Sequence, residues 1–438
     1  MFLVYKHKVG FSNVAFICLV LVNSVVFAET KQIDSSSQTL QLAPFIQKVL
    51  QQNPKILQTQ AAWESSQSRI SQVSAYPDPM LSYSLAPQTV FSDQTNYGQI
   101  ITASQHLPWP GKQQLKGEIA QWQANAAQEN MITTRLALIA ASKIRYADWQ
   151  FVHAAIRINE QNKILLEEFK NIAEIKYSAG RASKQDVLRA EVERTLLARK
   201  DEELTREKNI ITSQINTLLN QKPDNHVSPP NIEFTRHVSI DITKLKEIVL
   251  RDHPQLKQIN ANVVASEKKL ALAKQNFYPD VQLKASYNNL RMNTDNRFTL
   301  GIGINIPLQE KRQSAVDEAS LNKRKLNWQK QALIAKIQNS LQMYYSRLTE
   351  SEQIIQLYES RLLPLTDENL QAARSDYESG QGNFLDMITA EQNLIELQLQ
   401  LAKTHANYQQ HYALLEELSG GQEILQQASE KNKQGDKS

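Results

Sequence analysis

The sequence predicts a mainly α-helical protein with a two-fold internal repeat, in which each half runs helix, strand, strand and long helical hairpin. Three observations predict this fold. One motif occurs twice, long stretches lack proline and glycine, and two pairs of short segments alternate between apolar and polar residues. The two copies of the motif have the same spacing: Tyr177, Gly180, Asp186, Ala190 and Glu191, and Tyr377, Gly380, Asp386, Ala390 and Glu391.

Composition favours long helices and disfavours one class of partner. The 438 residues include 14 prolines and 12 glycines, fewer than the usual shares of about 5% and 7%. The formal net charge of +4 is small and comes from many charges of both signs. It therefore gives no indication of nucleic-acid binding.

Residues 1–28 are expected to be a secretory signal peptide. Lys6 and Lys8 precede an apolar core over residues 14–22, and Val26-Phe27-Ala28 offers a cleavage site. An uncleaved membrane anchor is the alternative, although the core is shorter than the roughly 20 residues that a helix needs to span a bilayer.

The only cysteine, Cys18, lies inside this apolar core. Its removal with the signal peptide would exclude disulfides and thiolate metal sites from the mature chain. Lipidation of Cys18 is disfavoured, because the residues before it are not the usual small ones.

The rest of the chain divides into two repeats joined by a linker. We expect the first repeat over residues 29–222 and the second over 243–420. A proline-containing linker covers 223–242, and a polar tail covers 421–438.

Each repeat is expected to open with one amphipathic helix, over residues 40–75 and 243–276. The two segments align at Asn53-Pro54 and His253-Pro254. Each is followed by Tyr-Pro-Asp, where proline is expected to stop the helix.

Two strands are expected next in each repeat, over about 79–107 and 280–307. Alternation is clearest from Val281 to Asn288 and from Phe298 to Ile306, where apolar and polar or small residues occupy opposite faces. Such strands suit a transmembrane barrel with a wet lumen. A half-buried hairpin on a soluble domain fits the alternation equally well.

The hairpin helices follow, with tips near Gly180 and Gly380. Residues spaced seven apart indicate coiled-coil packing: Leu197, Leu204, Ile211 and Leu218 in the first repeat, and Met387, Leu394, Leu401, Tyr408 and Leu415 in the second. Pro364, which has no counterpart in the first repeat, is expected to kink the second hairpin.

Helix lengths suggest how the pieces stack. A helix over residues 111–177 would be roughly 100 Å long, whereas the returning helix over 182–220 would reach only roughly 58 Å. Two short helices stacked end to end would equal the long helix in length. We therefore expect the helix over 182–220 to stack on 243–276, and the helix over 386–418 to stack on 40–75. Four strands cannot close a membrane barrel, for which about eight are needed, so a barrel requires several copies.

This combination resembles the TolC-like outer membrane factors over nearly all of the mature chain. The resemblance implies a homotrimer with a 12-stranded transmembrane β-barrel in outer membrane lipid and an α-helical tunnel in the periplasm. It implies a passive exit duct of a tripartite efflux system, with a periplasmic adaptor and a proton-driven inner-membrane pump as partners. A periplasmic coiled-coil adaptor, or a structural protein, is the alternative of another class, but neither explains the paired strands.

The segment from Gln105 to Lys112 resembles that of the branch serving heavy-metal exporters. This implies heavy-metal cations as cargo, with type I secretion or drug efflux as alternatives. No cofactor and no protein metal site are expected, because the eight histidines are scattered and no catalytic motif occurs.

The resemblance also implies a gate at the hairpin tips. It assigns Asp186 and Tyr377 to a latch between hairpins, and Asp386 to a pore-facing acidic ring. Two positions depart from the family, since Gly382 replaces an arginine and Thr389 replaces a second acidic residue. The alternative is that both aspartates cap the helices that restart after the turns.

The turns themselves are expected to contact the adaptor. They comprise Gly180, Arg181, Ala182, Ser183, Gly380, Gln381, Gly382 and Asn383.

Overall fold

The computed structural model describes residues 39–85, 99–232, 240–289 and 297–421. These residues belong to one compact unit. The expected signal peptide and polar tail, apart from Gly421, lie outside the described residues, as does the stretch 233–239 of the expected linker.

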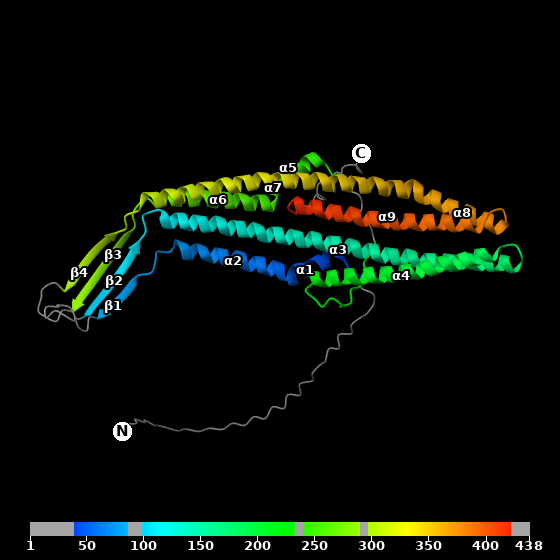
Figure 1. Ribbon diagram of the computed structural model, residues 1–438, viewed down its shortest axis with the longest axis horizontal. Helices are drawn as coiled ribbons and strands as arrows, with labels where there is room; N and C mark the ends of the chain where they lie inside the picture. The colour runs from blue at the N-terminus through cyan, green and yellow to red at the C-terminus, as the bar shows by residue number, and fades with distance from the viewer. Residues whose placement is uncertain (1–38, 86–98, 233–239, 290–296, 422–438) are drawn as a thin grey trace, which may run out of the picture. The chain divides into compact units, whose positions relative to one another are not determined.

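Both repeats have the predicted order of elements (Figure 1). The first contains α1 (Leu42–Gln52), α2 (Pro54–Ser74), β1 (Met80–Leu85), β2 (Gln99–Leu107), α3 (Lys112–Ser178) and α4 (Lys184–Leu218). The second contains α5 (Ile242–Asp252), α6 (Pro254–Gln275), β3 (Val281–Asn289), β4 (Phe298–Ile304), α7 (Gln309–Leu357), a π-helical turn (Tyr358–Leu362), α8 (Leu363–Ser379) and α9 (Phe384–Leu418). The predicted two-fold repeat is therefore confirmed.

The expectation of a single opening helix in each repeat was wrong. The chain leaves the helical conformation at Asn53 (φ −72°, ψ 124°) and at His253 (φ −58°, ψ 121°). The cause is the proline that follows each residue, since its ring disfavours the α conformation in the residue before it. Asn53 and His253 then cap the second helix by accepting the amides of Lys55 and Gln255. Burial lowers the pKa of His253 to about 4, so its ring stays neutral.

The expected stacking of the helices was also wrong. The end of α4 meets α1 and α2 of its own repeat, where the Asn53 side-chain amide donates to the Leu218 carbonyl at 2.9 Å. The end of α9 likewise meets α5 and α6, because Val249, Leu256 and Leu415 share one hydrophobic cluster. Figure 1 shows α2, α1 and α4 in line, and α6 in line with α9. Helix length alone could not decide whether a returning helix stacks on the opening helices of its own repeat or of the other repeat, since the combined lengths fit in both cases.

The heptad residues of α4 and α9 are buried or partly buried against the long helices. Leu204 and Ile211 share a cluster with Trp149 of α3, and Met387 and Leu394 share another with Phe169 of the same helix. Helix α3 therefore lies between α4 and α9, and both hairpins pack through it.

The π-helical turn directly precedes Pro364, the residue expected to kink the second hairpin. Proline has no N–H and its ring crowds the carbonyl four residues earlier. A locally widened turn relieves this conflict, and such turns are a recognised cause of helix bending.

The four strands form one antiparallel sheet in the order β1-β2-β3-β4. Register places Leu81, Ala103, Ala285 and Leu300 in one row, and the hydroxyl residues Ser82, Thr102, Ser286 and Thr299 in the next. One face is therefore apolar and the other polar. Among the described helices, none is both long and apolar enough to cross a membrane.

Candidate functional site

Glycine at both hairpin tips is required by backbone conformation. Gly180 has φ +72° and Gly380 has φ +84°, which are left-handed values. A Cβ at either position would meet no atom within 4 Å, so space is not the reason. The amide of Arg181 donates to the Lys176 carbonyl at 2.8 Å, and Gln381 donates to Asp376 at 2.9 Å. This closes the end of each helix with a left-handed cap.

Gly382 has a different, steric reason to be glycine. A Cβ there would lie 2.9 Å from the Asp376 Cβ, while the Gly382 amide donates to the Asp376 carbonyl at 2.9 Å. The turn is too tight for any side chain. The missing arginine at this position is thus explained by the conformation of the second tip.

Ser183 and Asn383 cap the helices that follow the tips, and the tip aspartates lie in the first turn of those helices. Ser183 Oγ accepts the Asp186 amide at 3.3 Å and donates to Asp186 Oδ1 at 3.0 Å. Asn383 Oδ1 accepts the Asp386 amide at 3.0 Å and its Nδ2 donates to Asp386 Oδ2 at 2.7 Å. Each aspartate thus supplies the capped amide and also accepts a hydrogen bond from the capping side chain, rather than from the N-cap backbone amide as in a capping box.

The structure brings Tyr377 and Asp186 together. The Tyr377 hydroxyl donates to Asp186 Oδ2 at 3.4 Å, joining α8 to α4. Tyr377 is buried, with its ring edge-on to Phe384 and the Lys176 ammonium 4.7 Å from its centroid. Burial, together with the Asp186 charge, raises the pKa of the phenol to about 12, so it remains a donor.

Asp386 and Thr389 do not join this contact. Both are exposed on α9, and Thr389 Oγ1 donates to the Leu385 carbonyl of its own helix at 2.8 Å. At the tips, Arg181, Ser183, Gln381 and Asn383 are exposed, and Ala182 is half-buried.

Glu391 is a site residue whose environment the sequence motif did not reveal. It is 1% exposed, and one carboxyl oxygen has no hydrogen-bond partner among the described residues. Burial and the nearby Glu193 raise its pKa to about 8, although a hydrogen bond with Asn162 opposes the shift. The Asn162 carbonyl oxygen also lacks a donor among these residues. Glu391 is therefore protonated at neutral pH.

The counterpart in the first repeat, Glu191, has the opposite environment. It forms ion pairs with Arg194 at 2.6 Å and Lys170 at 3.4 Å. The only signal in the sequence was the position of Glu391 on α9, four residues after Met387 and three before Leu394, both buried. A groove of about 430 Å³ between α3, α4 and α9 passes over Glu391.

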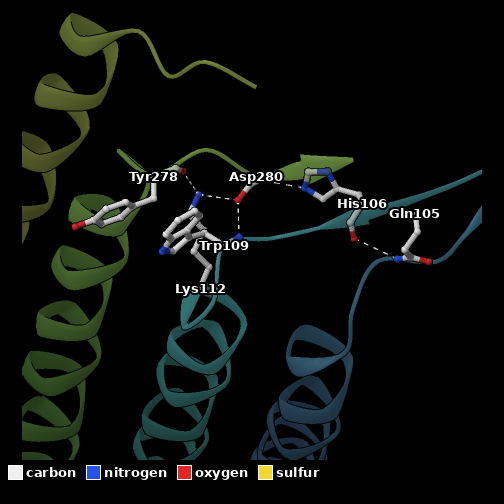
Figure 2. Close-up of polar contacts among 6 residues, drawn as sticks. All are labelled: Gln105, His106, Trp109, Lys112, Tyr278 and Asp280. Carbon is white, nitrogen blue, oxygen red and sulfur yellow. Dashed lines mark hydrogen bonds and ion pairs between the residues drawn. The ribbon is translucent and has the colours of Figure 1, made fainter. Parts of the chain in front are cut away.

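A second constellation lies where the strands meet the helices (Figure 2). Lys112 is 4% exposed, and its ammonium donates to Asp280 Oδ1 and to the Tyr278 carbonyl, both at 2.8 Å. The Trp109 amide donates to the same Asp280 oxygen at 2.9 Å, and the Trp109 and Tyr278 rings stack 5.1 Å apart. Burial would raise the pKa of Asp280, but the Lys112 and Trp109 hydrogen bonds bring it below its ordinary value.

The segment from Gln105 to Lys112 therefore has a structural role in this chain. Its hydrogen bonds connect the end of β2 and the start of α3 to the turn between α6 and β3. Gln105 adds a hydrogen bond to the Pro77 carbonyl at 2.7 Å, so both repeats are held at this junction.

Comparisons with known proteins agree with this geometry. The model of the family described as outer membrane efflux protein matches residues 45–218 and 245–421. Toxin and drug export protein A of Aggregatibacter actinomycetemcomitans is 22% identical over 316 residues, which cover 66% of this chain and 65% of that relative's length. Nodulation protein T of Rhizobium leguminosarum bv. trifolii is 23% identical over 379 residues, covering 79% of this chain and 78% of the relative.

Solved structures share the fold. The CusC structure, described with transmembrane channel formation, superposes with a TM-score of 0.75 at 16% identity, covering 87% of this chain and 92% of CusC. The resemblance to TolC-like factors drawn from the sequence is confirmed. Because the family model matches most of both repeats, the chain belongs to the outer membrane efflux protein family of bacterial outer membrane channels.

Proposed function

We propose that three copies of this chain form a passive exit duct, which conducts substrate delivered by an inner-membrane pump through a periplasmic adaptor. The two-faced sheet carries this proposal. Its apolar side chains are exposed, with Leu81 76%, Leu300 73% and Ile302 77% accessible, which suits contact with lipid. The edge strands β1 and β4 need partners in a membrane. Three copies joined edge to edge would close a 12-stranded barrel, with the polar faces lining a wet lumen.

Membrane fractionation and gel mobility test this assembly. We expect the chain in the outer membrane fraction, running as a trimer on gels without heating and as a monomer after boiling. A soluble monomer in the periplasmic fraction would contradict the proposal.

The helical part would form a tunnel that ends at the tips. We propose that the tips, which are Gly180, Arg181, Ala182, Ser183, Gly380, Gln381, Gly382 and Asn383, contact the adaptor. Exposure of Arg181 and Gln381 supports this role. We propose a proton-driven pump, as the resemblance to the TolC-like factors implies.

Tyr377→Phe is expected to loosen the closed tunnel. The substitution keeps the ring that packs on Phe384 but removes the bond to Asp186, and hydrogen bonds to charged groups contribute about 1.5–3 kcal/mol. Single-channel recordings should show openings several-fold more frequent. Tyr177→Phe is the matched control, since Tyr177 occupies the same place in the first repeat and is 48% exposed. Equal opening frequencies in both variants would refute the latch.

Asp386→Asn is expected to make the channel less cation-selective. Three exposed carboxylates near the tunnel mouth would attract cations and repel anions, and Thr389 adds no charge. Planar-bilayer reversal potentials in a salt gradient measure this change. Unchanged selectivity would rule out a pore-facing Asp386.

We propose heavy-metal cations as cargo on the basis of the segment from Gln105 to Lys112. The relative named toxin and drug export protein A supports the alternative of drugs or secreted proteins. In the described residues no cluster of three His, Cys, Asp or Glu side chains could hold a metal ion, so cations would pass rather than bind. A deletion strain sensitive to copper or zinc would support metal cargo, and one sensitive only to drugs would support the alternative.

A further inference from the structure

The polar face of the sheet carries one permanent charge among strands β1 to β4, and that charge is Lys284. Register pairs Lys284 with Ser104 on β2 and with Gly301 on β4. The next row on this face consists of the four hydroxyl residues Ser82, Thr102, Ser286 and Thr299. The Thr102 and Ser286 hydroxyls are 3.0 Å apart and bond to each other. Within the strands Lys284 is thus the one permanent charge on this face, where Met80 and Ile100 are apolar. Arg297, one residue before β4, accepts the Asn288 amide through its carbonyl at 2.7 Å and adds a second charge beyond the end of the strand.

The surroundings of Lys284 leave its side chain uncovered. Gly301 lies beside it, and a Cβ built on Gly301 would be 3.9 Å from the Lys284 Cβ with no other atom within 4 Å. Gly303 likewise lies beside Gln282, where an added Cβ would be 3.7 Å from the Gln282 Cβ. Lys284 is exposed, and no carboxylate of the described residues lies within ion-pairing distance of it.

The polarity of the two faces decides which way this charge points in a membrane. The residues flanking Lys284 along β3, Leu283 and Ala285, lie on the apolar face with Leu300 and Ile302. A lysine on the lipid side near the bilayer midplane is strongly disfavoured. A lysine on the opposite face meets water in a closed barrel, where its charge is retained at little cost.

We propose that Lys284 biases the ion selectivity of the barrel, where three copies form a ring of positive charge that attracts small anions. This inference rests on the proposed function, because the ring exists only in a conducting trimer. Rings of lysine or arginine are the usual means by which pores favour anions.

The proposed ring of Lys284 side chains lies far from the aspartates at the hairpin tips. Helix α3 connects the strands to the first tip and contains 67 residues, which corresponds to roughly 100 Å. Exposed charges are screened beyond about 10 Å at 0.1 M salt. Lys284 and Asp386 therefore act independently, at opposite ends of the conduction path.

Reversal potentials of trimers in planar bilayers test the inference. We expect the anion-to-cation permeability ratio to fall several-fold in Lys284→Gln, because the three charges attract anions and repel cations alike, and screening by salt limits the size of the effect. It should fall further in Lys284→Glu, and the differences should shrink from 0.1 M to 1 M salt. Ser286→Ala is the matched control on the same face and should leave the ratio unchanged.

Chemical restoration of the charge distinguishes an effect of the charge at position 284 from an effect of misfolding. In Lys284→Cys, a cationic methanethiosulfonate should restore the permeability ratio, and an anionic one should lower it further. Equal ratios in wild type, Lys284→Gln and Lys284→Glu, with no response to either reagent, would overturn the role of Lys284 while leaving the channel itself intact. A protein that forms no trimer and conducts no ions would instead overturn the proposed function and this inference with it.

Discussion

Glu391→Gln is expected to stabilise the folded protein increasingly as pH rises from about 4.5 to 8, with the full effect above pH 8. Burial raises the pKa of Glu391 from 4.5 to about 8 in the folded state. Between these values the folded chain holds a proton that the unfolded chain has released, so the free energy of unfolding falls as pH rises. The slope is about 1.4 kcal/mol per pH unit for one group. Glutamine keeps the shape and stays neutral, so this slope should disappear.

Groups on three helices bear on this titration. Glu193 of α4 opposes ionisation of Glu391, and Asn162 of α3 donates to it. Lys200, Glu396 and Lys403 line the groove above it. Thermal unfolding at pH 5, 7 and 8.5 measures the effect. Glu191→Gln is the matched control: Glu191 is only half-buried and is paired with Arg194, which holds its pKa below the ordinary value, and we expect little change. The same pH dependence in Glu391→Gln and wild type would contradict a buried neutral acid.

Lys112→Met is expected to destabilise the junction between strands and helices by about 3 kcal/mol or more. Removing one partner of a buried ion pair leaves the other charge without compensation. The side chains of Lys112 and Asp280 are only 5% and 20% exposed, and the Trp109 amide and the His106 ring, 3.8 Å from Asp280 Oδ2, would then remain for Asp280.

An exposed ion pair supplies the comparison. Lys268 and Glu118 are 2.7 Å apart, with side chains 38% and 32% exposed, and such pairs contribute at most about 1 kcal/mol. Lys268→Met should therefore lower the unfolding temperature less than Lys112→Met. Adding Asp280→Asn to Lys112→Met should recover part of the loss. If the two lysine variants unfold at the same temperature, Lys112 has no special role.

Local signals in the sequence were sufficient for the order of elements. Isolated glycines at 180 and 380, proline after each strand pair and strict alternation on β3 and β4 each act within a few residues, and all specify the structure found. The helix break at Asn53 is also specified locally, by the proline that follows it. The amphipathic pattern continues across this proline and therefore predicted one helix instead of two.

Features that depend on distant partners could not be predicted. Glu191 and Glu391 occupy the same place in the repeat, yet Glu191 is ion-paired and half-buried, whereas Glu391 is fully buried beside Asn162. That difference arises from the helices packed around each residue. The same holds for helix stacking, where lengths fit two pairings and the bond from Asn53 to Leu218 selects one. The tightness of the turn at Gly382 likewise follows from the position of Asp376.

The central claim is that three copies close their sheets into one conducting channel. Native mass spectrometry of the purified outer membrane species, combined with bilayer recording from the same preparation, tests it most directly. We predict an assembly of three chains that conducts ions. A conducting assembly of two or four chains, or a trimer that never conducts, would contradict it.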